Sequence, residues 1–168
     1  MSIGERIDKV HLPAAAIAGV GVSVYRSREE SDYERLLEVL GGLLGGCLGG
    51  VLPDLLDLPT SPNHRGLAHG GVAVVALVKR NSMGAVQRLR ESADAFRHAA
   101  QDLSLSPQVR KEYALREALC RLAAGFVVGV QAGYLSHLAL DLFTPRGLPP
   151  ISWSDGRLQR TPSGPTHS

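Results

Sequence analysis

The chain has 168 residues, a formal net charge of +2, an aromatic content of 5% and 19 glycines. This length suits one domain with its own core, and a charge so close to neutral gives no electrostatic footprint for nucleic acid, so we expect no nucleic-acid partner. The sequence also lacks the alternating β-branched and aromatic runs that predict strands. We therefore predict an all-α fold, a compact bundle of apolar helices rich in Gly and Ala.

The N-terminal region predicts an apolar helix from about His11 to Tyr25. Glu5 and Asp8 precede it, and these acids are not compatible with the basic start of a secretory signal, so no signal peptide is expected. A polar stretch follows this helix.

A second helix is predicted to begin at a capping box, in which Ser31 and Glu34 satisfy each other's backbone donors. It extends to about Val51 and contains GGLLGGCLGG, where glycine pairs recur every four residues. Each glycine costs about 1 kcal/mol of helix propensity, so another backbone must pack closely against this helix. We prefer packing inside the chain, and the alternative is a homo-oligomer formed through the glycine-rich helix.

The segment after this helix, PDLLDLPTSPNHRGLAH, combines prolines with two aspartates. The prolines interrupt any long helix. Asp54 and Asp57 share one side of the chain if a helical turn spans residues 52–58. Carboxylates at this spacing are candidates for a metal site.

His64, Arg65 and His69 follow in the same segment. The two histidines converge if His64 precedes the third predicted helix, which begins near Leu67, and His69 lies within it. Arg65 suits an anionic substrate such as phosphate. The alternative interpretation is a polar surface loop with solvated histidines.

Residues 80–119 are highly charged and carry apolar positions at helical spacing, which predicts an amphipathic helical hairpin. Ser106 and Pro107 are typical of the start of its second helix. We interpret this insertion as a solvated two-helix arm, with a lid, a membrane contact or a dimer contact as alternatives. Residues 1–153 are predicted to form one helical metal-site domain, and residues 154–168 a disordered polar tail.

A final apolar helix is predicted from residue 122 to residue 143. His137 and Asp141 are four residues apart and therefore project from one face, either as two ligands of one ion or as a hydrogen-bonded pair in the core. Pro145 and Gly147 end the helix. Arg146 then lies beside Asp141, where it serves a site or compensates the helix dipole.

Four motifs occur in this order: His11 at the start of an apolar helix, Leu52-Pro53-Asp54, S-x-x-H-R-x-x-x-H at residues 61–69, and GYLSHLALDLFTPRG at residues 133–147. Together they resemble the YdjM-type family of inner-membrane-associated, metal-dependent hydrolases. Two departures stand out, since many members carry a histidine directly after the second acid of LPDxDH and a serine after the second histidine. This chain has Leu-Asp57-Leu in the first place and Gly70 in the second.

The resemblance implies a helical protein with a metal centre. Its ligands would be His11, Asp54, His64, His69, His137 and Asp141. Such a nitrogen and oxygen set suits Zn first, with Mn or Fe as alternatives, and six ligands allow one or two ions. Asp57, Arg65 and Arg146 are the catalytic candidates, with Asp57 acting as a base or orienting a histidine.

The resemblance further implies a hydrolase whose metal-activated water attacks a phosphoester or phospholipid-type substrate. The alternative is a membrane-associated helical adaptor or assembly protein with a structural metal. A catalytic centre keeps an open coordination position, whereas a structural one is closed.

Two uncharged stretches, residues 39–53 and 122–136, are shorter than the ~20 residues that a membrane span needs. The mean hydropathy is only +0.02. We therefore expect a protein that is cytoplasmic or peripheral to the inner membrane, with the membrane surface as a partner. Cys47 and Cys120 lie in apolar surroundings and are interpreted as reduced core residues.

Overall fold

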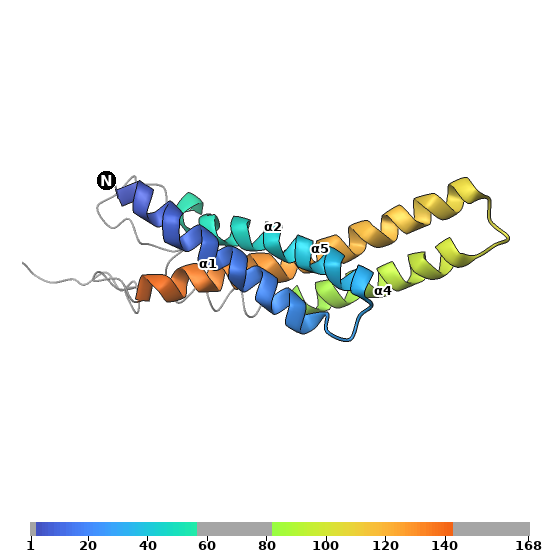
Figure 1. The fold of residues 1–168 in the computed structure, drawn as a ribbon, viewed down its shortest axis with the longest axis horizontal. Helices are drawn as coiled ribbons and strands as arrows, with labels where there is room; N and C mark the ends of the chain where they lie inside the picture. The colour runs from blue at the N-terminus through green and yellow to red at the C-terminus, as the bar shows by residue number, and fades with distance from the viewer. Residues whose placement is uncertain (1–2, 57–81, 143–168) are drawn as a thin grey trace, which may run out of the picture.

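The computed structural model describes residues 3–56 and 82–142. Within these ranges every regular element is a helix: α1 (Ile3–Arg26), α2 (Asp32–Leu56), α4 (Ser82–Gln101) and α5 (Pro107–Leu142). Helices α1, α2 and the C-terminal part of α5 pack as a bundle, and α4 runs beside the N-terminal part of α5 to form an arm (Figure 1). The prediction of an all-α bundle is confirmed.

Two predicted helix starts are confirmed by their capping bonds. Both the hydroxyl and the backbone N–H of Ser31 donate to Glu34 Oε2, at 2.6 and 2.9 Å, directly before α2. The Glu34 N–H lies 3.4 Å from Ser31 Oγ and completes the capping box. At the start of α5 the Val109 N–H donates to Ser106 Oγ at 3.4 Å, and Pro107 is the first helical residue.

Two predicted boundaries are wrong. The second helix of the hairpin and the apolar helix predicted from residue 122 are one continuous helix, α5, of 36 residues. Helix α1 begins at Ile3, well before His11. In both places the character of the side chains changes but the helix continues, because a change in charge alone does not end one. Pro13, two residues after His11, lies inside α1 and does not end it either. The third helix predicted near Leu67 and the tail at 154–168 lie outside the described residues.

The glycines of α2 form two columns that contact two different helices. A Cβ atom on Gly45 would lie 2.1 Å from the carbonyl oxygen of Phe126 on α5, and one on Gly46 would lie 2.5 Å from that of Ala15 on α1. The other four glycines of the motif repeat this pattern and all six are buried. Packing inside the chain is therefore the role that these glycines have, and they present no surface to a second copy.

The glycine contact makes a prediction about stability. Gly45→Ala forces α2 and α5 apart and should lower the free energy of unfolding by about 1–3 kcal/mol. Gly21→Ala is the matched control, because a Cβ at this exposed site on α1 meets nothing within 4 Å and alanine gains up to about 1 kcal/mol of helix propensity. Denaturant unfolding followed by circular dichroism measures both, and equal stability of the two variants would contradict the close approach.

A buried ion-pair network joins the arm to the bundle. The Arg121 side chain on α5 is 1% exposed. Its guanidinium lies 2.8 Å from Glu34 and 3.4 Å from Glu38, both on α2, and 2.6 Å from Asp94 on α4. Arg90 on α4 donates to Glu38 at 2.9 Å. Buried charges are tolerated where each has such partners, so this network holds three helices at one junction.

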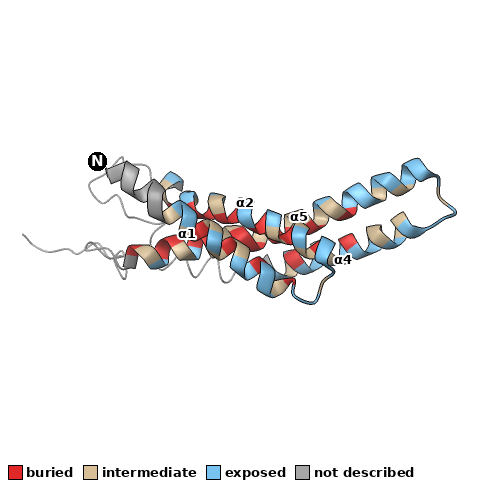
Figure 2. Ribbon diagram, viewed as in Figure 1, coloured by how far each residue is buried: buried red, intermediate tan, exposed pale blue. Residues whose placement is uncertain are grey.

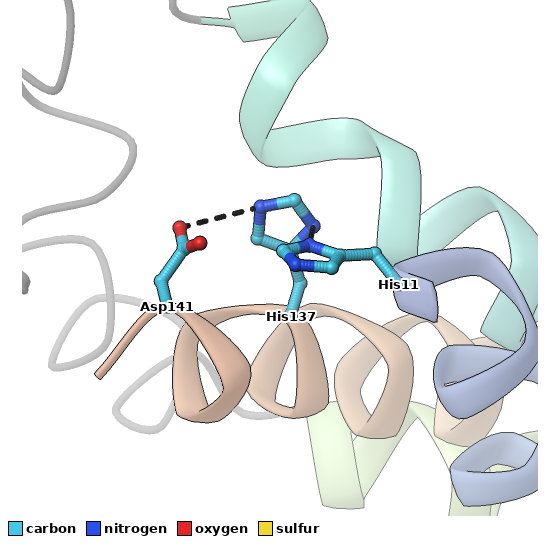
Figure 3. Close-up of side chains that lie close together, drawn as sticks. All are labelled: His11, His137 and Asp141. Carbon is cyan, nitrogen blue, oxygen red and sulfur yellow. Dashed lines mark hydrogen bonds and ion pairs between the residues drawn. The ribbon is translucent and has the colours of Figure 1, made fainter. Parts of the chain in front are cut away.

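The arm beyond this junction is largely solvated (Figure 2). At its tip the Ser104 N–H donates to the Asp102 carboxylate at 2.8 Å, and hydrogen bonds from the Ser104 hydroxyl and N–H lower the pKa of Asp102 below its ordinary value. The arm extends away from the end of α5 that carries His137 (Figures 1 and 3). It therefore does not cover that residue as a lid, and the solvated-arm interpretation agrees with the structure.

Removing the central cation should destabilise the fold strongly. Arg121→Met leaves buried carboxylates short of a partner and should cost about 3–5 kcal/mol of unfolding free energy. Arg88→Met, on the exposed side of α4, should stay within about 0.5 kcal/mol of wild type. Urea titration of the two variants tests the difference, and a small loss for Arg121→Met would show that the network adds little to stability.

Candidate metal centre

Four of the six predicted ligands converge at the end of the bundle opposite the arm. His11 comes from α1, Asp54 from the last turn of α2, and His137 and Asp141 from α5. Figure 3 shows His11 and Asp141 on either side of the His137 ring. His11, His137 and Asp141 each offer one ligand atom, and these atoms lie within 4.8 Å of one another.

One edge of the His137 ring contacts a backbone carbonyl. His137 Nδ1 lies 2.6 Å from the carbonyl oxygen of Gly50. A carbonyl oxygen only accepts, so the neutral tautomer that satisfies this contact carries its proton on Nδ1 and its lone pair on Nε2. His11 Nδ1 lies 3.2 Å from the same nitrogen, and the two rings meet edge to face at 84°.

The opposite edge of the ring, which carries Nε2, points toward two carboxylates. Its Nε2 lies 3.6 Å from Asp54 Oδ1 and 3.5 Å from Asp141 Oδ2. Charge-assisted N–H···O bonds are about 2.7–2.9 Å long, so these contacts are too long for strong hydrogen bonds. Ligand atoms 2.0–2.2 Å from a tetrahedral ion lie about 3.3–3.6 Å apart, so each carboxylate oxygen lies from Nε2 at the spacing of two ligands around one ion.

A proline in α2 lies beside the two groups that this helix contributes, the Gly50 carbonyl and the Asp54 carboxylate. Pro53 lies inside the helix, is fully buried and has no N–H to donate to the carbonyl of Gly49, one turn earlier. A helix opens at such a point and frees nearby carbonyls for side chains. The carbonyl of Gly50 contacts His137 at this level, and Asp54 follows directly after the proline.

The four side chains differ in exposure, and His11 is half-buried. His137 and Asp141 are 1% and 5% exposed, whereas Asp54 is 39% exposed. The histidine and the buried carboxylate therefore form the inner wall of the site, and Asp54 marks its solvent side.

The remaining predicted residues lie outside the described part of the chain, so their placement stays a prediction. They are Asp57, His64, Arg65, His69 and Arg146. The carbonyl of Gly50 was not predicted, because every residue has a carbonyl and no sequence motif marks one that accepts from a side chain.

A family model described as YdjM inner membrane protein matches residues 9–166. The chain belongs to the YdjM family. The match includes all four residues of the cluster, from His11 on α1 to Asp141 on α5. Comparison with curated proteins and with solved structures found no match.

The family description names an inner membrane protein, and two helices of this YdjM family member bear on that location. Among the described residues, α2 and α5 are long and apolar enough to cross a membrane. This is a criterion of length and composition, and the buried core helix of a soluble protein also meets it. Membrane association agrees with both observations.

Proposed function

We propose that this YdjM family member is a metal-dependent hydrolase of the inner membrane, acting on a phosphoester or phospholipid-type substrate. The observation that carries the proposal is the orientation of His137. Its protonated Nδ1 is engaged by the Gly50 carbonyl, and its Nε2 faces Asp54 and Asp141 at 3.5–3.6 Å.

The electrostatics of this arrangement favour a cation. Nε2 of His137 lies 3.5 Å from the buried Asp141 carboxylate and 3.6 Å from that of Asp54, so negative charge gathers at this edge of the ring. A divalent ion neutralises the carboxylates at the separations observed. The mixed nitrogen and oxygen set suits Zn first, and Mn or Fe also, with one or two ions.

A divalent ion held by these residues would supply Lewis acidity and would lower the pKa of a bound water toward neutrality. The chain's own contribution is to orient and to exclude water. The Gly50 carbonyl fixes the tautomer and ring plane of His137. Burial of His137 and Asp141 keeps bulk water from the inner wall, and the more exposed Asp54 leaves the substrate one side from which to approach.

Three predicted residues outside the described part complete the proposal. Arg65 and Arg146 would bind an anionic group such as a phosphate, because a guanidinium pairs with its oxygens in bidentate fashion. Asp57 would act as a base or orient a histidine.

An apolar surface on the bundle supports the proposal that the substrate lies in a membrane. Large apolar side chains on α2 are exposed at helical spacing, namely Leu40, Leu44, Leu48, Val51 and Leu55. They form a stripe along α2 that ends beside Asp54. A stripe of this kind suits the acyl region of a bilayer, which would bring a phospholipid headgroup to the level of the site.

Metal binding is the first test. His137→Ala should lower zinc affinity about 100-fold or more, because it removes a buried ligand. His98→Ala, an exposed histidine on α4, is the matched control and should bind as wild type does. Elemental analysis of the purified proteins and competition with a chelating dye measure the effect. A wild-type protein that takes up no Zn, Mn or Fe would refute the proposal.

Hydrolysis is the second test. Metal-loaded wild type should cleave bis(4-nitrophenyl) phosphate or the phosphoester of vesicle phospholipids, and Asp54→Asn should lower kcat/KM about 100-fold or more. Asp102→Asn, at the tip of the arm, is the control carboxylate and should retain full activity. A protein that binds metal tightly yet hydrolyses neither substrate would favour the adaptor with a structural metal.

A further inference from the structure

Helix α1 packs closely against α2 beside the cluster, at Gly50. A Cβ atom on Gly50 would lie only 2.4 Å from the Cβ of Ala15, which is completely buried, and 3.6 Å from the carbonyl oxygen of His11. Ala15 is one turn after His11 on the same helix, so both residues share one face of α1. The separation of the two helices at this level is therefore set by the missing side chain at position 50.

This separation decides where His11 lies. The other three members of the cluster come from α2 and α5, and only His11 comes from α1. A normal contact between two carbon atoms is about 3.5–4.0 Å, so a methyl group on residue 50 would displace α1 by more than about 1 Å. Metal ligands must be within about 0.2 Å of their ideal distances, and such a displacement removes His11 from reach.

We propose that Gly50 is a positioning residue of the metal centre, since its lack of a side chain lets α1 bring His11 to His137. This inference rests on the proposed metal site and assigns a role to a residue with no ligand atom in its side chain. Residue 50 has a backbone carbonyl whatever its side chain, and the His11→Ala background separates an effect at this carbonyl from one that passes through α1 and His11.

The test is a set of variants at Gly50, Ala15 and His11. Gly50→Ala introduces the methyl group, and Ala15→Gly with Gly50→Ala removes the Cβ that it would meet. Gly21→Ala controls for the helix propensity gained by replacing a glycine, because a Cβ there meets nothing within 4 Å. His11→Ala, alone and with Gly50→Ala, shows whether the effect passes through His11.

The measurements are zinc affinity by chelator competition, the visible absorption spectrum of the Co²⁺-substituted protein, and helicity by circular dichroism. Gly50→Ala should bind zinc about 10–100-fold more weakly and should show the Co²⁺ spectrum of His11→Ala. The double variant with Ala15→Gly should return to within about 3-fold of wild-type affinity and to its spectrum. In the His11→Ala background, Gly50→Ala should cause no further loss.

Several results would overturn the inference. Unchanged affinity and spectrum in Gly50→Ala would do so while leaving the metal site intact. A further loss in the His11→Ala background would show that Gly50 acts by another route. If Gly50→Ala does not fold, a folded, metal-binding double variant with Ala15→Gly supports the inference and an unfolded one refutes it. Wild-type protein that binds no metal refutes the proposed function as well, so the two failures are distinguishable.

Discussion

Direct backbone contact between α2 and its two neighbours is the constraint on which the rest of the structure depends. Glycine places no Cβ between helices, so the carbonyl oxygens of Ala15 on α1 and Phe126 on α5 lie where side chains would otherwise keep them apart. The helix propensity lost in α2 is offset by this packing. The close approach brings side chains from three helices together at each end of the bundle. Neither the ion-pair network nor the histidine cluster could form from the residues of one helix.

Both ends of the bundle bury carboxylates, but the two ends satisfy them differently. At the base of the arm, Arg121 supplies a guanidinium to carboxylates from α2 and α4, so these carboxylates have a cationic partner within the chain. At the opposite end, about 30 Å away along α5, Asp141 faces an imidazole nitrogen at a separation too long for a strong hydrogen bond. The first arrangement pairs carboxylates with arginines, and the second has a carboxylate and an imidazole nitrogen at the spacing of two ligands around one ion. This contrast is the physical reason for distinguishing a structural cluster from a candidate site.

Local signals predicted the parts of the fold that depend on neighbours in sequence. The capping box at Ser31, the restart at Ser106 and the shared face of His137 and Asp141 all follow from spacing within one turn. The convergence of His11 and Asp54 on that pair came from the family resemblance, because no local rule links separate helices. The sequence also carries two signs of the ion-pair network. Glu30, Glu34 and Glu38, which all pair with Arg121, recur every four residues, and Arg121 is a lone charge beside an apolar stretch.

The continuity of α5 has a consequence for how the chain tolerates changes in length. Arg121 and His137 lie on one unbroken helix, so the number of residues between them sets both their separation and their relative angle. Inserting a single residue there would turn His137 by about 100° and move it about 1.5 Å along the axis relative to the arm junction. Either the ion pairs or the histidine cluster would then lose register. The same insertion at the solvated tip between α4 and α5 disturbs neither, so the turn at residues 102–106 is where this fold can change in length.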